Sequence, residues 1–299
     1  MSIDDPQYCG YVALVGRPNV GKSTLLNNLL GQKISITSRK PQTTRHRITG
    51  IDTREQYQTV FVDTPGIHQT QTNAMNRYMN RAASSTIADV DVIVFIVDRL
   101  VWNEEDELVV KNLANAKAPI ILVINKVDRI VEKNRLLPHI QTLASHFSWA
   151  DILPISAKNG YNVDALREAI NKRLPAKPHF YDADQITDRS ERFMAAELIR
   201  EKLMRQCGDE LPYQVAVEIE EYKHVNHIVH IHALIWVERE GQKKIIIGKS
   251  GEQIKSIGTD ARKDIEIMTD QKVMLKLWVK VKSSWSDDER MLKSLGFEE

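Results

Sequence analysis

The stretch Gly16-Arg-Pro-Asn-Val-Gly-Lys-Ser23 fits the pattern Gly-x-x-x-x-Gly-Lys-Ser. It follows the apolar, strand-like run 11–15 and precedes residues 24–30, whose leucines have helical spacing. A glycine-containing turn between a strand and a helix lets backbone N–H groups surround a phosphate, and the helix N-terminus adds positive potential. The stretch therefore predicts a phosphate-binding loop, in which Lys22 reaches the outer phosphates and Ser23 is placed to bind Mg²⁺.

Around this loop, residues 8–175 alternate short β-branched runs with longer amphipathic stretches. The apolar runs are 11–15, 59–62, 92–97, 120–124 and 152–154, and stretches of helical length include 104–116 and 132–146. Alternating strands and helices predict βαβ units, and hence an α/β domain with a mostly parallel sheet covered on both faces. A hairpin formed by 48–52 and 56–63 is the one expected exception.

The pattern changes beyond residue 175. Residues 176–189, which begin with a proline-containing stretch and continue with an acidic one, are predicted to be a linker between a domain over 8–175 and a domain over 190–299. In the second domain we expect a helix, two strands, an apolar strand before a glycine loop, two helices and a last strand, at 190–206, 214–220, 230–238, 245–247, 252–257, 259–268 and 273–282. This order predicts an α+β fold unlike the first domain.

Asp63-Thr-Pro-Gly66 stands at the end of the second strand of the predicted hairpin, of which Asp63 is the last residue. A carboxylate at the carboxyl end of a strand beside a phosphate-binding loop is placed to hold Mg²⁺ through water. The N–H of Gly66 can donate to a terminal phosphate. Alone, the tetrapeptide is an ordinary turn, but together with the loop it predicts a nucleoside triphosphate site.

Asn125-Lys-Val-Asp128 follows the apolar run 120–124, and Ser156-Ala-Lys158 follows the next strand. The Asp128 carboxylate can accept hydrogen bonds from both N1–H and the exocyclic amine of guanine, a pair of donors that adenine lacks. Lys126 can cover the base, Asn125 can bond its edge, and the Ala157 N–H can donate to its O6. Ligands bind at the carboxyl ends of parallel strands, so the predicted nucleotide is GTP or GDP. The predicted contacts are Gly16, Arg17, Pro18, Asn19, Val20, Gly21, Lys22, Ser23, Thr24, Asp63, Thr64, Pro65, Gly66, Asn125, Lys126, Asp128, Ser156, Ala157 and Lys158.

These motifs together resemble the translation-factor-related class of P-loop GTPases. The resemblance implies that Gln42, Thr43, Thr44, Arg45 and His46 form switch I. It makes Thr44 an expected Mg²⁺ ligand beside Ser23 and Asp63, with Thr43 as the alternative.

Catalysis in this class is assigned to Lys22, Thr44, Gly66 and Asn19. Many relatives place a glutamine after the Asp-x-x-Gly motif, where this chain has Ile67, so slow hydrolysis is expected. Asn19 matches a residue that holds K⁺ in several related GTPases, and shaping the loop is its alternative role.

Gly248-Lys-Ser-Gly251 forms a Gly-x-x-Gly loop in the second domain. Glycines in such a loop let nucleic-acid phosphates approach closely. The order of the surrounding elements resembles a type II KH domain, a fold that binds RNA. The expected RNA contacts are Gly248, Lys249, Ser250, Gly251, Lys255, Lys243 and Lys244, and a plain packing domain is the alternative.

The pairing of these two domains over nearly the whole chain resembles the Era family of bacterial GTPases. The resemblance implies binding near the 3′ end of small-subunit (16S) ribosomal RNA and action in 30S subunit assembly. It also implies peripheral attachment to the cytoplasmic face of the inner membrane, and a monomer is expected. Two other classes stay open: a membrane-associated signalling adaptor with secondary RNA binding, and an RNA-modifying enzyme.

Composition narrows the alternatives further. With 42% hydrophobic and 27% charged residues, the 299-residue chain is neither mainly disordered nor collagen-like. Residues 1–175 carry 21 Lys and Arg against 17 Asp and Glu, and residues 176–299 carry 20 against 23, which excludes nucleic-acid binding through bulk charge. No apolar run approaches the ~18–20 residues of a membrane span. The two cysteines cannot build a disulfide framework, so a cytoplasmic location is expected.

Four of the nine histidines are close together in the second domain, at His224, His227, His230 and His232. A solvated turn and strand is the expected role, with metal binding or RNA contact as alternatives.

Overall fold

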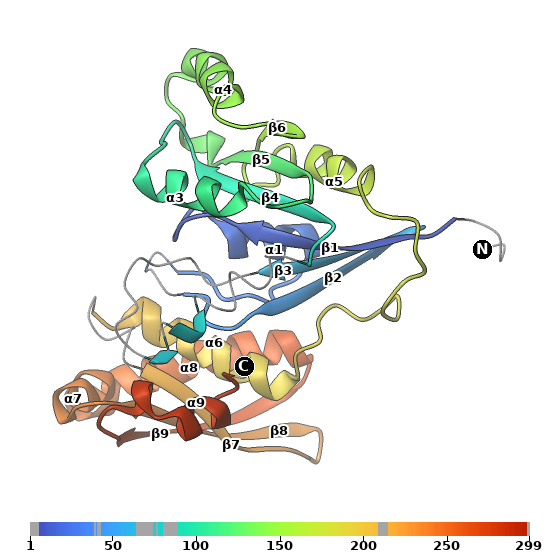
Figure 1. The fold of residues 1–299 in the computed structure, drawn as a ribbon. Coiled ribbons are helices and arrows are strands. Elements are labelled where there is room, and N and C mark those ends of the chain that lie inside the picture. Colours follow the sequence, from blue (N-terminus) through green and yellow to red (C-terminus); the bar gives the residue numbers. More distant parts are fainter. Residues whose placement is uncertain are drawn as a thin grey trace. The chain divides into compact units, whose positions relative to one another are not determined.

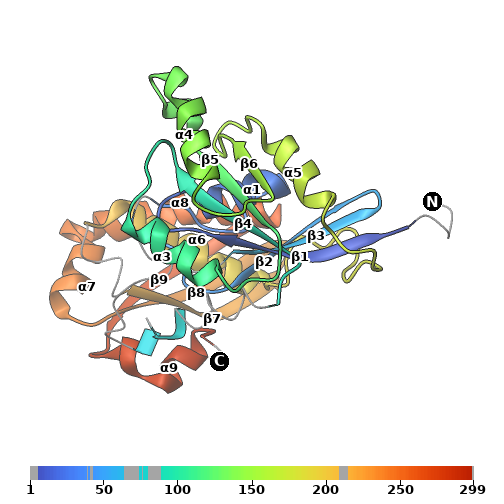
Figure 2. The same ribbon diagram turned by 45° about the horizontal axis from the view of Figure 1, so that its top comes forward.

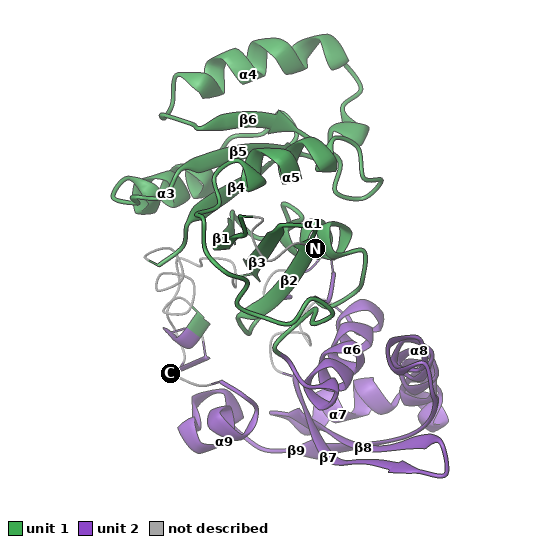
Figure 3. Cartoon of the chain, turned by 90° about the vertical axis from the view of Figure 1, so that its right-hand side faces the viewer, with its two compact units in different colours: residues 1–35, 44–68, 79–188 green, residues 36–43, 69–78, 189–299 purple. Residues whose placement is uncertain are grey.

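The computed structural model describes residues 6–38, 40, 43–63, 74–75, 77–79, 89–208 and 215–297. The chain forms two compact units (Figure 3). Unit 1 comprises residues 1–35, 44–68 and 79–188, and unit 2 comprises 36–43, 69–78 and 189–299. The expected division into domains over 8–175 and 190–299 did not assign residues 36–43 and 69–78 to the second unit.

Unit 1 is built on a six-stranded sheet in the order β2-β3-β1-β4-β5-β6 (Figure 1). The strands are β1 (Tyr8–Val15), β2 (Ile48–Arg54), β3 (Tyr57–Asp63), β4 (Val92–Asp98), β5 (Ile120–Asn125) and β6 (Asp151–Pro154). All pairs are parallel except β2 with β3. The predicted mostly parallel sheet and its hairpin are therefore confirmed.

Helices cover both faces of this sheet, and Figure 2 shows α1 and α3 on opposite sides. The helices are α1 (Lys22–Leu30), α3 (Glu104–Leu113), α4 (Leu136–Ala144) and α5 (Val163–Asn171), with 3₁₀ turns η1 (Val127–Arg129) and η2 (Lys133–Arg135). Strands β4 and β5 are buried along their whole length, which explains their unbroken apolar sequence. The helix predicted over 132–146 is shorter, because its first turn is the 3₁₀ turn η2.

The predicted linker packs along unit 1 as far as Asp188. The N–H of Ile51 donates to the carbonyl of Ile186 at 2.8 Å, and Gln58 donates to the carbonyl of Tyr181 at 2.8 Å. These bonds join the segment to β2 and β3, so most of the segment is held against the first unit.

Unit 2 contains a three-stranded sheet in the order β7-β8-β9. Its elements are α6 (Glu191–Gln206), β7 (Val215–Val225), β8 (Ile228–Val237), α7 (Glu240–Ile247), η4 (Lys249–Gly251), α8 (Glu252–Thr269), β9 (Lys272–Val281), η5 (Trp285–Asp287) and α9 (Glu289–Ser294). Strand β8 pairs antiparallel with β7 and parallel with β9. Side chains from α6, α8 and all three strands form one buried apolar cluster. The predicted α+β fold is confirmed.

Two details of the prediction for unit 2 are wrong. Residues 245–247 form the end of helix α7 and not a strand, with Ile246 buried and Ile245 53% exposed. The three isoleucines suggested a strand, but Gln242 Oε1 accepts from the N–H groups of Glu238 and Arg239 at 2.8 and 2.9 Å and starts a helix before them. The two helices expected at 252–257 and 259–268 are one helix, α8, in which Gly258 lets Leu277 of β9 approach closely.

No helix among the described residues combines the length and the apolar character needed to cross a bilayer.

Candidate nucleotide site and basic loop

The phosphate-binding loop lies between β1 and α1, as predicted. Lys22 is buried, and its Nζ donates to the carbonyls of Gly16 and Arg17 at 2.9 and 3.1 Å. Burial lowers the pKa of Lys22 to about 8, while the nearby Asp63 carboxylate opposes this shift. Gly21 has φ 107°, and a Cβ there would lie 2.4 Å from Asn125 Nδ2, so the loop approaches the base-recognition loop too closely for any side chain at this position.

The three expected Mg²⁺ ligands lie together. Ser23 Oγ is 2.8 Å from Asp63 Oδ2 and 2.9 Å from Thr44 Oγ1. Burial raises the pKa of Asp63, opposed by the nearby Lys22 charge and by hydrogen bonds from Ser23, Ser35 and Thr44. Its Oδ1 is buried, and no group in the described part of the chain donates a hydrogen bond to it. Two hydroxyls and a carboxylate are oxygen ligands of the kind that Mg²⁺ prefers, so this donor set fits the ion.

The structure distinguishes the two candidate threonines of switch I. Thr44 Oγ1 lies 3.4 Å from Asp63 Oδ2, whereas Thr43 Oγ1 donates to Ser38 Oγ and to the Lys40 carbonyl at 3.1 and 2.6 Å. The arrangement favours Thr44. The neighbouring Arg45 and His46 are also buried.

Asn125 connects three loops, a role that we had not expected. Its Nδ2 donates to the Val20 carbonyl at 2.8 Å, and its Oδ1 accepts from the Lys126 and Ala157 N–H groups at 2.7 and 2.9 Å. The Ala157 N–H that was expected to meet guanine O6 is thus bonded to Asn125. These contacts hold the phosphate-binding loop and the base-recognition loops in fixed relative positions.

Asp128, the expected guanine-recognition residue, is held by Ser156, whose Oγ donates to Asp128 Oδ1 at 2.6 Å. Both side chains line a cavity of about 250 Å³ together with Tyr161. The N–H and amine donors of a guanine therefore have an oriented carboxylate available. Lys158 follows Ser156 on the same loop. Pro18 lies in the phosphate-binding loop, and Thr24 lies just after it.

Two carboxylates were missed by the sequence analysis. Asp98 at the end of β4 pairs with Lys126 at 3.0 Å, and Lys126 Nζ also donates to the Asn19 carbonyl at 2.7 Å. Burial alone would raise the pKa of Asp98, but hydrogen bonds from Arg99 and Lys126 lower it. Buried Asp106 in the capping box of α3 pairs with Arg17 at 3.2 Å. An acidic residue at the end of a strand next to the Asn-Lys-x-Asp strand was the available signal for Asp98.

Four predicted site residues lie outside the described residues: Gln42, Thr64, Pro65 and Gly66. Ile67 lies there too. Their expected roles stay predictions.

The basic loop of unit 2 joins two helices. Gly248 ends α7 with φ 71°, and a Cβ there would lie 2.5 Å from Gln253 Cβ. Gly251 caps α8 with φ 81°, and nothing lies within 4 Å of a Cβ built there. Lys249 and Ser250 between them are exposed, as are two of the other expected RNA contacts, Lys244 and Lys255, while Lys243 is half-buried. The loop therefore presents positive charge and a helix N-terminus, which together suit a phosphate.

The clustered histidines do not form a metal site. His232 makes an edge contact with the ring of Trp278 at 5.4 Å, and His224 lies 3.2 Å from Gln271. The described residues include no group of three or more His, Cys, Asp or Glu side chains placed to hold a metal.

Two family models match this chain. One, described as "50S ribosome-binding GTPase", matches residues 11–126, and one described as "KH domain" matches residues 210–286. The protein named GTPase Era in Ectopseudomonas mendocina is 63% identical over 289 residues, covering 97% of both chains. GTPase Era of Pseudomonas putida is 60% identical over 297 residues, covering 99% of this chain and 98% of the relative.

Two solved structures are similar over 98% of this chain and 100% of their own, each with 40% identity and a TM-score of 0.94. One is a variant of Aquifex aeolicus Era with a single Tyr-to-Ala substitution, bound to GDP and AlF₄⁻. The other is Era in complex with MgGDPNP and nucleotides 1506–1542 of 16S ribosomal RNA.

Replacing Asp128 with asparagine should weaken binding of a GTP analogue about 100-fold, because two charge-assisted hydrogen bonds of about 1.5–3 kcal/mol each are lost or weakened. The affinity for xanthosine triphosphate should rise relative to that for GTP, since the C2 carbonyl of xanthine can accept a hydrogen bond from the new amide. Titration with fluorescent nucleotides measures both affinities. The matched control is Asp164→Asn on α5, where the carboxylate is exposed. Equal loss for both nucleotides would contradict a role for Asp128 at the base.

Proposed function

This chain belongs to the Era family of GTPases, and we propose that it is a slowly hydrolysing GTP switch that binds small-subunit ribosomal RNA near its 3′ end during 30S assembly. The observation that carries the nucleotide part is the cluster of Ser23, Thr44 and Asp63 oxygens beside the buried Lys22 ammonium. Such a cluster suits the phosphates and Mg²⁺ of a nucleoside triphosphate.

Hydrolysis in this site depends on positioning and on neutralising charge. The phosphate-binding loop and Lys22 would orient the outer phosphates, and Ser23, Thr44 and Asp63 would hold the metal. When bound, Mg²⁺ would supply positive charge for the oxygens on which negative charge develops. Gly66 is assigned a backbone hydrogen bond to the terminal phosphate. Ile67 has no polar group to orient water, which is why we expect slow turnover.

Asn19 supports a further proposal, a K⁺ ion beside the phosphates. Its side chain is exposed and its φ of 64° turns the loop. Exchanging Na⁺ for K⁺ should raise kcat about tenfold, equivalent to about 1.4 kcal/mol of transition-state stabilisation. In a phosphate-release assay, the Asn19→Ala variant should hydrolyse GTP at the same rate in K⁺ as in Na⁺. If Asn19 only shapes the loop, the substitution should instead lower the rates in both salts by the same factor.

The RNA part of the proposal rests on the basic loop. The family member crystallised with nucleotides 1506–1542 of 16S ribosomal RNA supports a segment of that sequence as the ligand. The exposed Lys249 and the N-terminus of α8 are suited to backbone phosphates, and the glycines keep side chains out of their way.

The proposal also includes a cytoplasmic location with peripheral attachment to the inner membrane, and a monomeric state. These two parts rest on family resemblance alone. The competing function is a membrane-associated signalling adaptor that binds RNA only secondarily. No particular contact among the described residues favours it.

Thr44→Ala should raise the Mg²⁺ concentration needed for binding of a GTP analogue about tenfold, because one oxygen ligand is lost. GDP binding should change less, since the triphosphate brings the metal to Thr44. Isothermal titration at several Mg²⁺ concentrations measures the effect. The adjacent Thr43→Ala variant is the control and should change it less than twofold. A larger effect of Thr43→Ala than of Thr44→Ala on the Mg²⁺ requirement would assign the metal to Thr43.

Gly251→Asp should weaken binding of a 16S 3′-end RNA about tenfold at moderate salt, because a negative charge meets the phosphates. Gly31→Asp is the matched control, with φ 67° and nothing within 4 Å of its Cβ, at the end of α1 in unit 1. Footprinting and filter binding with the GTP analogue bound provide the readout. If neither the parent protein nor the variants protect this RNA, liposome flotation of nuclease-treated protein would test the adaptor function.

A further inference from the structure

Helix α6 contains four charged side chains that are almost completely buried: Glu197, Arg200, Glu201 and Lys202. Burying charges costs free energy unless each one is paired and hydrogen-bonded, and apolar replacements of similar volume are often no less stable. Their presence in one helix therefore calls for a role beyond stability.

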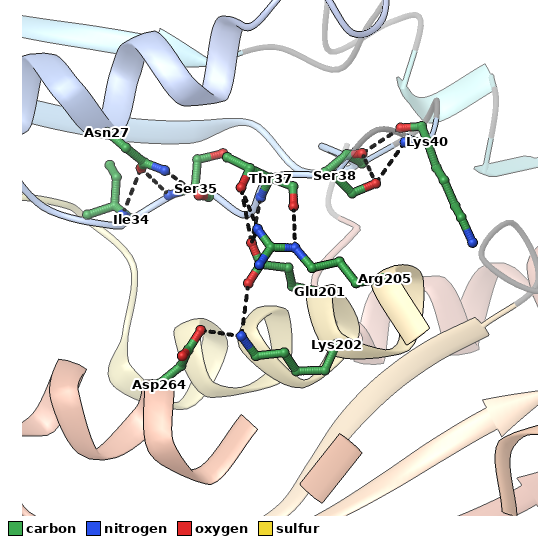
Figure 4. A network of polar contacts seen from close by, with 11 residues as sticks. Asn27, Ile34, Ser35, Thr37, Ser38, Lys40, Glu201, Lys202, Arg205 and Asp264 are labelled. Atoms are coloured by element: carbon green, nitrogen blue, oxygen red, sulfur yellow. Dashed lines mark hydrogen bonds and ion pairs between the residues drawn. The ribbon is translucent and has the colours of Figure 1, made fainter. Parts of the chain in front are cut away.

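Glu201 and Arg205 surround the backbone of Thr37 (Figure 4). Glu201 Oε1 accepts from the Thr37 N–H at 2.8 Å and from its hydroxyl at 3.3 Å. Arg205 donates to the Thr37 carbonyl at 3.0 Å and to its hydroxyl at 2.8 Å. Each hydrogen-bonding group of Thr37 is thus bonded to α6. Arg205 also pairs with Glu201 at 2.9 Å, which orients both side chains.

Arg200 holds the other end of the same segment. Glu197 binds its guanidinium with both carboxylate oxygens, at 2.7 and 2.6 Å. The oriented guanidinium also donates to the Thr43 carbonyl. Segment 36–43 is therefore attached to α6 at both ends.

The two residues that flank this segment are in the candidate metal site. Ser35, directly before it, donates to Asp63 Oδ2 at 2.9 Å. Thr44, directly after it, is the expected Mg²⁺ ligand and lies 2.9 Å from Ser23 Oγ. Fixing the segment at Thr37 and Thr43 restricts the backbone one or two residues from each of these side chains.

We propose that Glu201 and Arg200 of α6 are positioning residues for GTP binding and hydrolysis, because they hold segment 36–43 so that Thr44 stays at the metal. Neither residue touches the nucleotide. The inference rests on the proposed metal role of Thr44. It makes the first helix of unit 2 part of the machinery that sets the affinity for the triphosphate.

The test compares Glu201→Gln, Thr37→Val and the double variant in the full-length protein. Glu201→Gln removes the charge and keeps the shape, and Thr37→Val removes one hydroxyl. Each should weaken Mg²⁺-dependent binding of a GTP analogue about three- to tenfold and raise KM for GTP, while GDP affinity stays within about twofold. The double variant should lose little more affinity than the weaker-binding single variant, because both substitutions break the same contact.

Asp264→Asn is the matched control. Asp264 is half-buried and pairs with the buried Lys202 at 2.5 Å, so its variant tests the loss of an ion pair next to Glu201. It should lower the melting temperature and leave the ratio of GTP-analogue to GDP affinity unchanged. Should Glu201→Gln fold poorly, Thr37→Val still tests the contact.

Three outcomes would overturn the proposal. They are equal losses of affinity for GDP and for the GTP analogue, unchanged affinities in both single variants, and additive losses of affinity in the double variant. Thr44→Ala is measured in parallel. If Thr44→Ala has no effect on Mg²⁺-dependent binding, the proposed metal site itself fails, which distinguishes that failure from failure of the positioning role.

Discussion

The candidate nucleotide site of unit 1 depends on the parallel register of its central strands. Strand β1 places Leu14 beside Asp63 of β3, and β4 places Asp98 beside Asn125 of β5. The phosphate-binding loop, the metal carboxylate and the base-recognition loop therefore leave the sheet at one edge. A shift of register by one residue would turn these side chains to the other face. The residues of β4 and β5 are buried along the whole length of both strands.

Charge is buried in both units, where it organises loops that have little regular structure. Lys22 and Asp63 are buried within one loop cluster of unit 1, and burial shifts the pKa of each toward its neutral form. Phosphates and Mg²⁺ would favour the charged forms, so the site is suited to ligands of both signs. In unit 2, Glu201 and Arg200 use their charges to hold an irregular segment of backbone. In both places a buried charged side chain is hydrogen-bonded to backbone or hydroxyl groups.

Much of the fold and site followed from local sequence patterns. The parallel sheet, the hairpin and the positions of Lys22, Ser23, Asp63 and Asp128 relative to their strands were predicted correctly, because each motif follows directly on an apolar run. Prediction was less successful in unit 2, where Ile245–Ile247 was expected to be a strand and is helical. Three β-branched residues favour a strand locally, but capping by Gln242 and burial of one face decided for a helix.

Local motifs and their strand-to-loop context were enough to show which chemical groups could bind a guanine nucleotide. The sequence did not show that Asn125 would connect three loops, that Asp98 would hold Lys126, or that α6 would bind segment 36–43. These contacts join residues from about 30 to more than 160 positions apart in the chain. Their partners are polar side chains on elements whose hydrophobic pattern gives no sign of them. Only tertiary packing decides them, because it alone brings donors and acceptors of distant elements within bonding distance.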